Sequence, residues 1–524
     1  MLSSETNDSL TSTALLHPTQ ALRAVLAPPL MPKLRTEVSL DGTALRDGLT
    51  GNIFPLNGIA LKTVAVMDGQ ISVHGVLANV ARECAIDPIH VERELRQLLL
   101  LGLLEGACDS YRKRFRQIRE GELPPQAVLA GSRFGCQGSG ACCRGYVFGP
   151  VSEKEKARIE AREPAKVMPH LANQPLFVKA RSNGGKPVYQ LATSGDACVF
   201  LEQGLTCGLH RAFGPTAKPA LCQLYPLAAL TTIEGLKVYD RGECATFAQS
   251  AATGDLLEDT VEKVRKLVDD QIYHPVVRLD KSWRCDYGMA LALAARLDEE
   301  ACFHPPLQAL QAIGQVTRTW ILALTQCPIE AGQPVAAVAG VLDRRASPFG
   351  STVAGVVPNT TFGLGRLASL AEELVENLAP TESMAASFTG AASLVSEVCR
   401  NLLSEQPMSR RARAATALPL QTDAEAALTL SLRHMLFGHE LLMDDHLPAG
   451  LLRMALVLLL AIAGARLRAL DEGAGAVSAG HLSFAHMVAK RKLNRHEPYL
   501  ILRTSGEQAW PILDALPQLA QKLS

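Results

Sequence analysis

Residues 134–146 read FGCQGSGACCRGY and place three cysteines among four glycines. Glycine lets a backbone fold tightly, so several thiolates from such a loop can converge on one centre. Ser152 and Glu155 follow with the spacing of a capping box, which predicts a helix that begins just after the loop. Because the N-terminal end of a helix dipole favours thiolates, this stretch predicts a ligand-binding loop.

Further cysteines follow this loop at ordered positions. Glu202-Gln203-Gly204 predicts a short hairpin between two of them, and strands at Ala228–Ile233 and Leu236–Asp240 predict a second hairpin before the last. Thiolate-rich sites select zinc or iron–sulfur clusters. The alternative, buried reduced cysteines that act as small hydrophobic residues, is disfavoured by their density and glycine context. The predicted metal ligands are Cys136, Cys142, Cys143, Cys198, Cys207, Cys222 and Cys244.

Composition bounds the class of protein. The chain has 524 residues, 48% of them hydrophobic, and Lys+Arg equals Asp+Glu at 52 each. A chain of this length can bury a sizeable core and is expected to hold about three domains. Zero net charge argues against a global electrostatic grip on nucleic acid. Thirteen cysteines are present, and the six outside the ordered group, Cys84, Cys108, Cys285, Cys302, Cys327 and Cys399, are scattered.

No secretory or membrane-spanning segment is expected. The N-terminus lacks a charged region followed by an apolar core. The most apolar stretch, Met454–Ala465, lies between Arg453 and Arg466 and is shorter than the roughly 20 residues of a membrane span. We therefore expect a buried helix, a cytoplasmic protein and no membrane partner. In that compartment cysteines stay reduced, so clustered ones indicate metal or redox chemistry.

The fold expected is α+β and predominantly helical, with a small N-terminal domain, an irregular cysteine-cluster domain and an all-helical C-terminal domain. The predicted boundaries are a flexible tail over 1–32, a winged-helix-like module over 33–107, a basic linker over 108–130, the cysteine-cluster metal-binding domain over 131–285 and a helical domain over 286–524.

The module at 33–107 shows strands followed by three helices. Arg35–Leu40 and Ile53–Leu56 alternate like strands, Asn57 is a predicted helix cap, and Asp87-Pro88 predicts a further helix start. The pattern resembles the PqqD-like domains that hold a peptide for a modifying enzyme. Winged helices often bind DNA, but seven basic and nine acidic residues in this module disfavour phosphate binding.

The helical domain carries two polar groups whose predicted role is solvation. His434, His439, Glu440, Asp444, Asp445 and His446 are expected in a solvated loop, and Lys490, Arg491, Lys492 and Arg495 on a solvated face. Gly363-Leu364-Gly365 precedes a predicted helix without the strand and third glycine of a dinucleotide loop. The sequence thus identifies neither a cofactor-binding loop nor a catalytic base.

The cysteine pattern is similar to the YkgJ-type cysteine-cluster family, also described as the CxxCxxCC or zinc- or iron-chelating family, which includes the flagellin lysine-N-methylases. The resemblance covers about 110 residues. It rests on four matches: Phe134 with Cys136, Cys142 and Cys143; Cys198-Val199-Phe200-Leu201; Cys207-Gly208-Leu209-His210-Arg211; and Pro219-Ala220-Leu221-Cys222-Gln223-Leu224-Tyr225-Pro226.

One position departs from the family pattern. Ser139 stands where the family has its second cysteine, and a serine hydroxyl is a poor ligand for soft metals. One site therefore uses fewer thiolates or recruits another group. His210, otherwise a surface histidine, and Cys285 are the two candidates.

The resemblance implies a protein that binds a metal, as a 4Fe–4S cluster or zinc. Its methylase branch implies S-adenosylmethionine-dependent methylation of a protein lysine, with the protein or peptide substrate held by the PqqD-like module. The alternative is a non-catalytic electron-transfer or structural metal-binding protein. A DNA-binding regulator is disfavoured by the acidic balance of the module, so no nucleic-acid partner is expected.

Overall fold

The computed structural model describes residues 31–122, 126–144, 148–180, 187–202, 206–268, 272–326, 360–377, 384–443, 445–494, 498, 501–502 and 508–523. The tail predicted over 1–32 lies almost wholly outside these residues, as do Gln203, Gly204, Cys327, Asp444 and Arg495. Helices predominate and the sheets are small, which confirms the predicted class. The chain divides into two compact units, the first formed by Met1–Gly121, His274–Glu299 and Gln315–Ser347 and the second by the rest.

The first unit contains a small antiparallel sheet and three helices that pack on one another. The strands are β1 (Val38–Asp41), β2 (Ala44–Asp47) and β3 (Ile53–Pro55), in that order. The helices are α2 (Gly58–Val66), α3 (Val73–Cys84) and α4 (Pro88–Leu100). The predicted caps are confirmed, since Asn57 accepts from the N–H of Ala60 and Asp87 from that of Ile89. β2 was not predicted.

Part of the predicted basic linker is a packed helix of the first unit. α5 (Asp109–Arg119) buries Tyr111 and Phe115, and it also buries Arg112. The guanidinium of Arg112 forms two hydrogen bonds, of 2.7 and 2.9 Å, with the buried carboxylate of Asp47. A bidentate pair of this kind stabilises a charge away from water, so this arginine is structural and not solvated. The unit also holds β14 (Val277–Arg278) and β15 (Arg284–Cys285).

The second unit contains the short strands that carry the cysteines. The hairpin predicted before Cys244 is present as β11 (Leu227–Thr232) and β12 (Gly235–Asp240), and β4 (Gln126–Val128) pairs parallel to β12. The other strands are β5 (Arg133–Phe134), β6 (Val151–Ser152), β7 (Phe177–Ala180), β8 (Val188–Leu191), β9 (Thr193–Ser194), β10 (Ala197–Cys198) and β13 (Asp255–Leu256). The short helices among them are η1 (Ala141–Cys143), α6 (Glu153–Glu160), α7 (Pro164–Val167), η2 (Pro169–Leu171), α8 (Gly208–Phe213), η3 (Pro215–Ala217), α9 (Ala220–Leu224), α10 (Phe247–Thr253), η4 (Leu257–Thr260) and α11 (Val261–Arg265).

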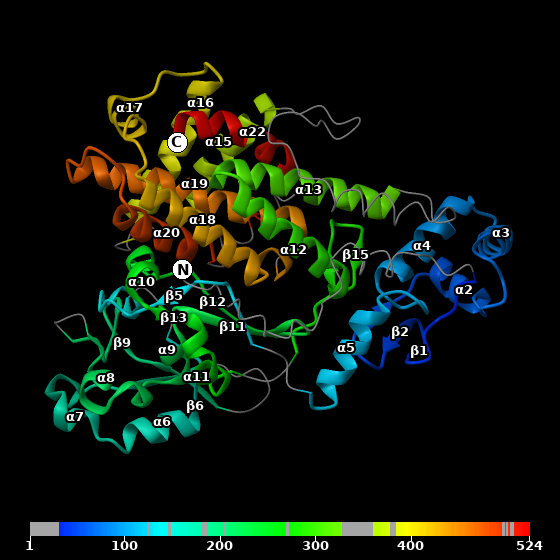
Figure 1. Cartoon of the computed structure of the whole chain (residues 1–524), viewed down its shortest axis with the longest axis horizontal. Coiled ribbons are helices and arrows are strands. Elements are labelled where there is room, and N and C mark those ends of the chain that lie inside the picture. Colours follow the sequence, from blue (N-terminus) through cyan, green and yellow to red (C-terminus); the bar gives the residue numbers. More distant parts are fainter. Residues whose placement is uncertain are drawn as a thin grey trace, which may run out of the picture. The chain divides into compact units, whose positions relative to one another are not determined.

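The described residues after Cys285 are largely helical, as predicted. The long helices are α12 (Tyr287–Phe303), α13 (Pro306–Gln326), α15 (Thr360–Glu376), α16 (Ala385–Leu402), α17 (Arg410–Thr416), α18 (Thr422–Phe437), α19 (Leu447–Asp471), α20 (Ala479–Leu493) and α22 (Ala509–Leu523), with the turn η5 (Glu440–Met443). In the second unit α19 lies among α16, α17, α20 and α22 (Figure 1). α18 and α20 also contact the cysteine-bearing region, through β12 and α10 respectively.

Among the described residues, α19 alone is long and apolar enough to cross a membrane, and 89% of its most apolar window is buried inside the molecule. Arg453 and Arg466 do not end this helix, which continues through both. Arg466 is fully buried, and its guanidinium donates to the carbonyl oxygen of Thr416 at 2.5 Å, at the end of α17. Burial of the helix agrees with the expected core position.

Candidate metal centre

The glycine-rich loop forms one tight turn that presents Cys142 and Cys143. Gly138 and Gly140 both have a φ of 66°, a left-handed conformation that glycine adopts without strain. The turn η1 follows, and the N–H of Cys143 donates to the carbonyl oxygen of Gly140 at 3.0 Å. Both cysteines are half-buried in this turn. The glycine context thus fixes this pair, as the sequence indicates.

Three more cysteines are brought to the turn by short elements. Cys198 ends β10, Cys207 directly precedes α8, and Cys222 lies within α9. A β-bridge joins Arg144 to Ala197, next to Cys198, and another joins Leu201 to Cys207. These pairings connect the glycine-rich loop to the Cys198 strand and that strand to the start of α8.

The same three cysteines and Cys143 pack around one hydrophobic cluster. Cys198 is a buried member of the cluster, and Cys143, Cys207 and Cys222 pack against it half-buried. The other buried members include Phe148, Val151, Ile159, Met168, Phe200 and Leu209. One side of the cysteine group therefore lies on apolar packing that excludes water.

The sulfur atoms of Cys142 and Cys143 are 3.8 Å apart. The hydrogen bond from Cys143 lowers the pKa of Cys142 below the usual thiol value, against the effect of burial, and the charges of Lys218 and Arg491 lower it further. That same hydrogen bond, together with burial, raises the pKa of Cys143. Of the two thiols, Cys142 is therefore the one that ionises first.

Cys198 and Cys222 remain neutral thiols because their pKa values are raised. Burial raises the pKa of Cys198 and of Cys222, each to about 12. The charges of Cys142 and Cys207 add to that increase at both positions, so these sulfur atoms lie within electrostatic reach of one another. A metal cation would reverse this effect, because it stabilises the thiolate form of its ligands.

Cys244 and Cys136 occupy the edges of the group. Cys244 follows β12, and its sulfur lies 3.2 Å from the hydroxyl of Thr246. Burial is the main cause that raises the pKa of Cys244, and the charge of Cys142 adds a smaller increase. Cys136 is exposed. The structure thus brings Cys142, Cys143, Cys198, Cys207 and Cys222 together, with Cys244 beside them.

The cysteine group suits a metal by the type of its side chains more than by their positions. Within the described ranges, no three His, Cys, Asp or Glu side chains converge closely enough to hold a metal ion. Two thiolates bound to one zinc ion at about 2.3 Å, in a tetrahedral site, would lie roughly 3.8 Å apart. The Cys142–Cys143 separation matches that spacing, and the other cysteines would have to move toward this pair to complete a site.

Neither group proposed to replace the missing family cysteine joins the cluster here. Ser139 is half-buried between the two left-handed glycines. His210 is exposed on α8. Cys285 belongs to the first unit, where it is buried and its electrostatic partner is Asp286.

The basic run on α20 was predicted to be solvated, and this prediction is wrong. Lys490, Arg491 and Lys492 are all at least 95% buried. Arg491 donates to backbone carbonyls and a hydroxyl in the cysteine region, and Lys490 forms a 2.6 Å ion pair with Glu440.

Three histidines of the polar group before α19 are also buried, where a solvated loop was expected. His434, His439 and His446 are each at most 3% exposed. Nε2 of His439 lies 2.9 Å from the amine of Lys237, and burial lowers the pKa of His439 far below its usual value. Burial likewise lowers the pKa of His434, so His434 and His439 are neutral packing residues.

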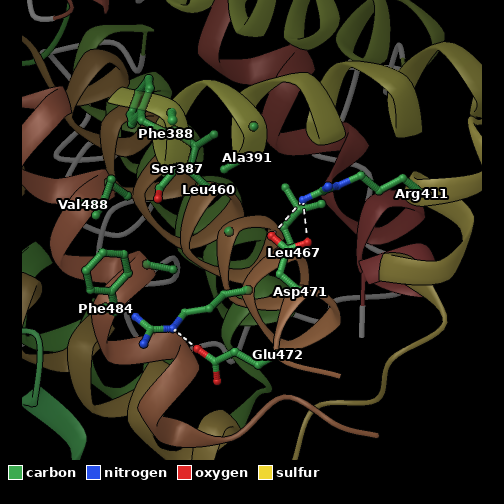
Figure 2. A pocket seen from close by; sticks show the side chains of 16 residues that line it. Ser387, Phe388, Ala391, Arg411, Leu460, Leu467, Asp471, Glu472, Phe484 and Val488 are labelled. Atoms are coloured by element: carbon green, nitrogen blue, oxygen red, sulfur yellow. Dashed lines mark hydrogen bonds and ion pairs between the residues drawn. The ribbon is translucent and has the colours of Figure 1, made fainter. Parts of the chain in front are cut away.

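A cavity of about 500 Å³ lies between α16, α19 and α20. Figure 2 shows Phe388, Phe484 and Val488 on one side of it and Arg411 with Asp471 on the other. Arg411 pairs with Asp471 at 2.7 Å and Arg468 with Glu472 at 2.8 Å, so the four charged lining residues are neutralised in pairs (Figure 2).

Two neighbouring cavities, of about 420 and 590 Å³, extend this space toward the cysteines. The cavity of about 420 Å³ shares Arg468, Glu472 and Phe484 with the cavity between α16, α19 and α20. Both are lined by Ala245 and Thr246, which directly follow Cys244. Open space therefore reaches the edge of the cysteine group.

The chain was compared with known proteins. No protein-family model matches it, and no curated protein and no solved structure matches it either.

Proposed function

We propose that the second unit binds a soft metal through its clustered cysteines, as zinc or as a 4Fe–4S cluster. The observation that carries this proposal is the approach of Cys142 and Cys143 to 3.8 Å, with Cys198, Cys207 and Cys222 packed around the same cluster. A single free cysteine often packs as a small hydrophobic residue, but five thiols from four separate elements in one place favour a shared soft-metal ligand set.

We further propose that this centre serves a protein lysine N-methylase that uses S-adenosylmethionine. The support is the similarity of the cysteine pattern to the methylase-containing family and of the N-terminal module to peptide-holding domains. The cavities beside Ala245 and Thr246 add room for a substrate next to Cys244. A purely structural metal site would need no such space.

The second candidate is a non-catalytic electron-transfer or structural metal protein. The burial of Cys198 within the hydrophobic cluster favours it, because closed sites with buried ligands stabilise a fold. The two candidates differ in turnover and not in metal content.

The experiment that separates them uses the full chain, purified without oxygen. It is incubated with S-adenosylmethionine and lysine-containing proteins, and mass spectrometry then measures methylated lysine. The methylase proposal predicts methyl transfer that the Cys142→Ala variant loses. Metal binding without methyl transfer to any protein offered, and without cofactor binding, would leave the non-catalytic function.

A further inference from the structure

A single buried guanidinium connects three of the cysteine-bearing segments. Arg491, on α20, is 95% buried. One terminal nitrogen donates to the carbonyl oxygens of Ala141 and Arg144, at 3.0 and 3.2 Å. The other donates to the hydroxyl of Tyr225 and to the carbonyl oxygen of Glu243, at 3.0 and 2.9 Å.

Each of these acceptors lies next to a predicted ligand. Ala141 and Arg144 flank the Cys142–Cys143 pair, Tyr225 follows the helix that holds Cys222, and Glu243 directly precedes Cys244. The hydroxyl of Tyr225 also donates to the carbonyl oxygen of Glu243 at 2.8 Å, which joins the second and third segments directly. One side chain from the helical layer thus fixes the relative positions of three loops.

The charge of Arg491 matters as well as its hydrogen bonds. A centre with several thiolates carries net negative charge, and its burial is costly unless a cation lies near. A planar guanidinium can bind several acceptors in a fixed geometry, which the ammonium of lysine cannot reproduce.

We propose that Arg491 is a positioning residue of the metal centre: it holds the Cys142–Cys143, Cys222 and Cys244 segments together before metal binds and offsets the charge of the thiolates afterwards. This proposal rests on the metal-binding function proposed above. The helical C-terminal layer is then part of the centre and not only a neighbouring domain.

The test compares Arg491→Met, Arg491→Lys and a matched control on the same helix. The control is Lys490→Met with Glu440→Gln, which removes a buried cation together with its partner and leaves the four hydrogen bonds of Arg491 in place. Zinc affinity of the full chain is measured by competition with a chromophoric chelator. Residues that support metal ligands typically contribute 10–100-fold to affinity, and we expect a loss of about that size for Arg491→Met.

Arg491→Lys keeps the charge but loses the planar guanidinium, so we expect an intermediate loss of zinc affinity. The control variant should bind zinc with an affinity within a few-fold of wild type. Unchanged zinc affinity in a folded Arg491→Met protein would overturn the proposal. An equal loss in the control would also overturn it, because the effect would then come from α20 as a whole.

A second measurement does not depend on metal. In metal-free protein, alkylation of Cys222 and Cys244 should become faster in Arg491→Met, while alkylation of the buried and isolated Cys399 should not. If wild-type protein binds neither zinc nor an iron–sulfur cluster, the proposed function fails, and this pattern still tests the positioning role. Equal alkylation rates in wild type and Arg491→Met would refute that role on its own.

Discussion

The carboxylate of Glu155 accepts a hydrogen bond of 2.8 Å from the backbone N–H of Ala220. The same carboxylate completes the capping box with Ser152 at the start of α6. Glu155 therefore accepts hydrogen bonds from backbone N–H groups at the N-terminal ends of two helices, α6 and α9, and α9 carries Cys222. Burial raises the pKa of this carboxyl, but the hydrogen bonds from Ala220 and Ser152 outweigh burial and lower it overall.

Removal of this carboxylate should loosen α9. Glu155→Ala is expected to lower the free energy of unfolding by about 1–2 kcal/mol, the range for a lost cap. It should also speed alkylation of Cys222, as measured by mass spectrometry. Glu160→Ala, which removes an exposed residue of the same helix paired with Lys156, is the control. Equal effects of the two substitutions would show that Glu155 does not hold α9.

Gly242 should not tolerate a side chain. Its φ is 66°, and a Cβ atom would approach the ring of His486 to 2.5 Å. Gly242→Ala is expected to destabilise the protein by roughly 2–4 kcal/mol, from the left-handed backbone and the overlap together. Gly473 has a similar φ of 69° and open space around it, so Gly473→Ala isolates the backbone contribution. Denaturant unfolding of both variants measures the difference, and equal losses would contradict the close approach.

Stability should fall in mild acid because of buried histidines. Burial, helped by the charge of Lys490, lowers the pKa of His434 to about 3 and that of His486 to about 4. The unfolded chain binds these protons near pH 6.5 and the folded chain does not, so stability is full above that pH. It should decrease below it by about 1.4 kcal/mol per pH unit for each histidine.

Unfolding by urea between about pH 7 and pH 5 measures this slope. His434→Gln is expected to reduce the slope by the contribution of one histidine, even though the variant is less stable at neutral pH. Replacement of the exposed His210 by Gln serves as the control. A slope that stays the same in His434→Gln would show that this ring is not kept neutral by the fold.

The Lys490–Glu440 pair should show strong coupling. Glu440 is kept ionised against burial chiefly by the charge of Lys490, which lowers its pKa. Lys490→Met alone leaves that carboxylate with less compensation, and removal of one partner of a buried pair typically costs about 3–5 kcal/mol. Addition of Glu440→Gln should restore most of this loss in a double-mutant cycle. Additive losses would contradict the coupling.

The sequence predicted local features and failed on burial set by distant partners. The Ser152–Glu155 capping box, the Asn57 and Asp87 caps and the hairpin before Cys244 are confirmed because each depends on residues within a few positions. The helical C-terminal part follows from apolar periodicity, which is also local.

Arg491 shows why the rest could not be predicted in the same way. Its acceptors at Ala141 and Glu243 are 350 and 248 residues away, and no pattern within α20 indicates them. The predicted solvated face is therefore wrong for Lys490, Arg491 and Lys492. The cysteine group was predicted from spacing, and the structure adds which of its members lie close together.

The metal and sulfide content of the full chain, purified without oxygen, is the most direct test of metal binding by the clustered cysteines. Bound zinc, or iron with sulfide, is expected in wild type. Most of that metal should be lost in the double variant Cys142→Ala/Cys222→Ala and retained in Cys399→Ala. Wild-type protein without metal, or a double variant that keeps all of it, would show that these cysteines do not form a metal centre.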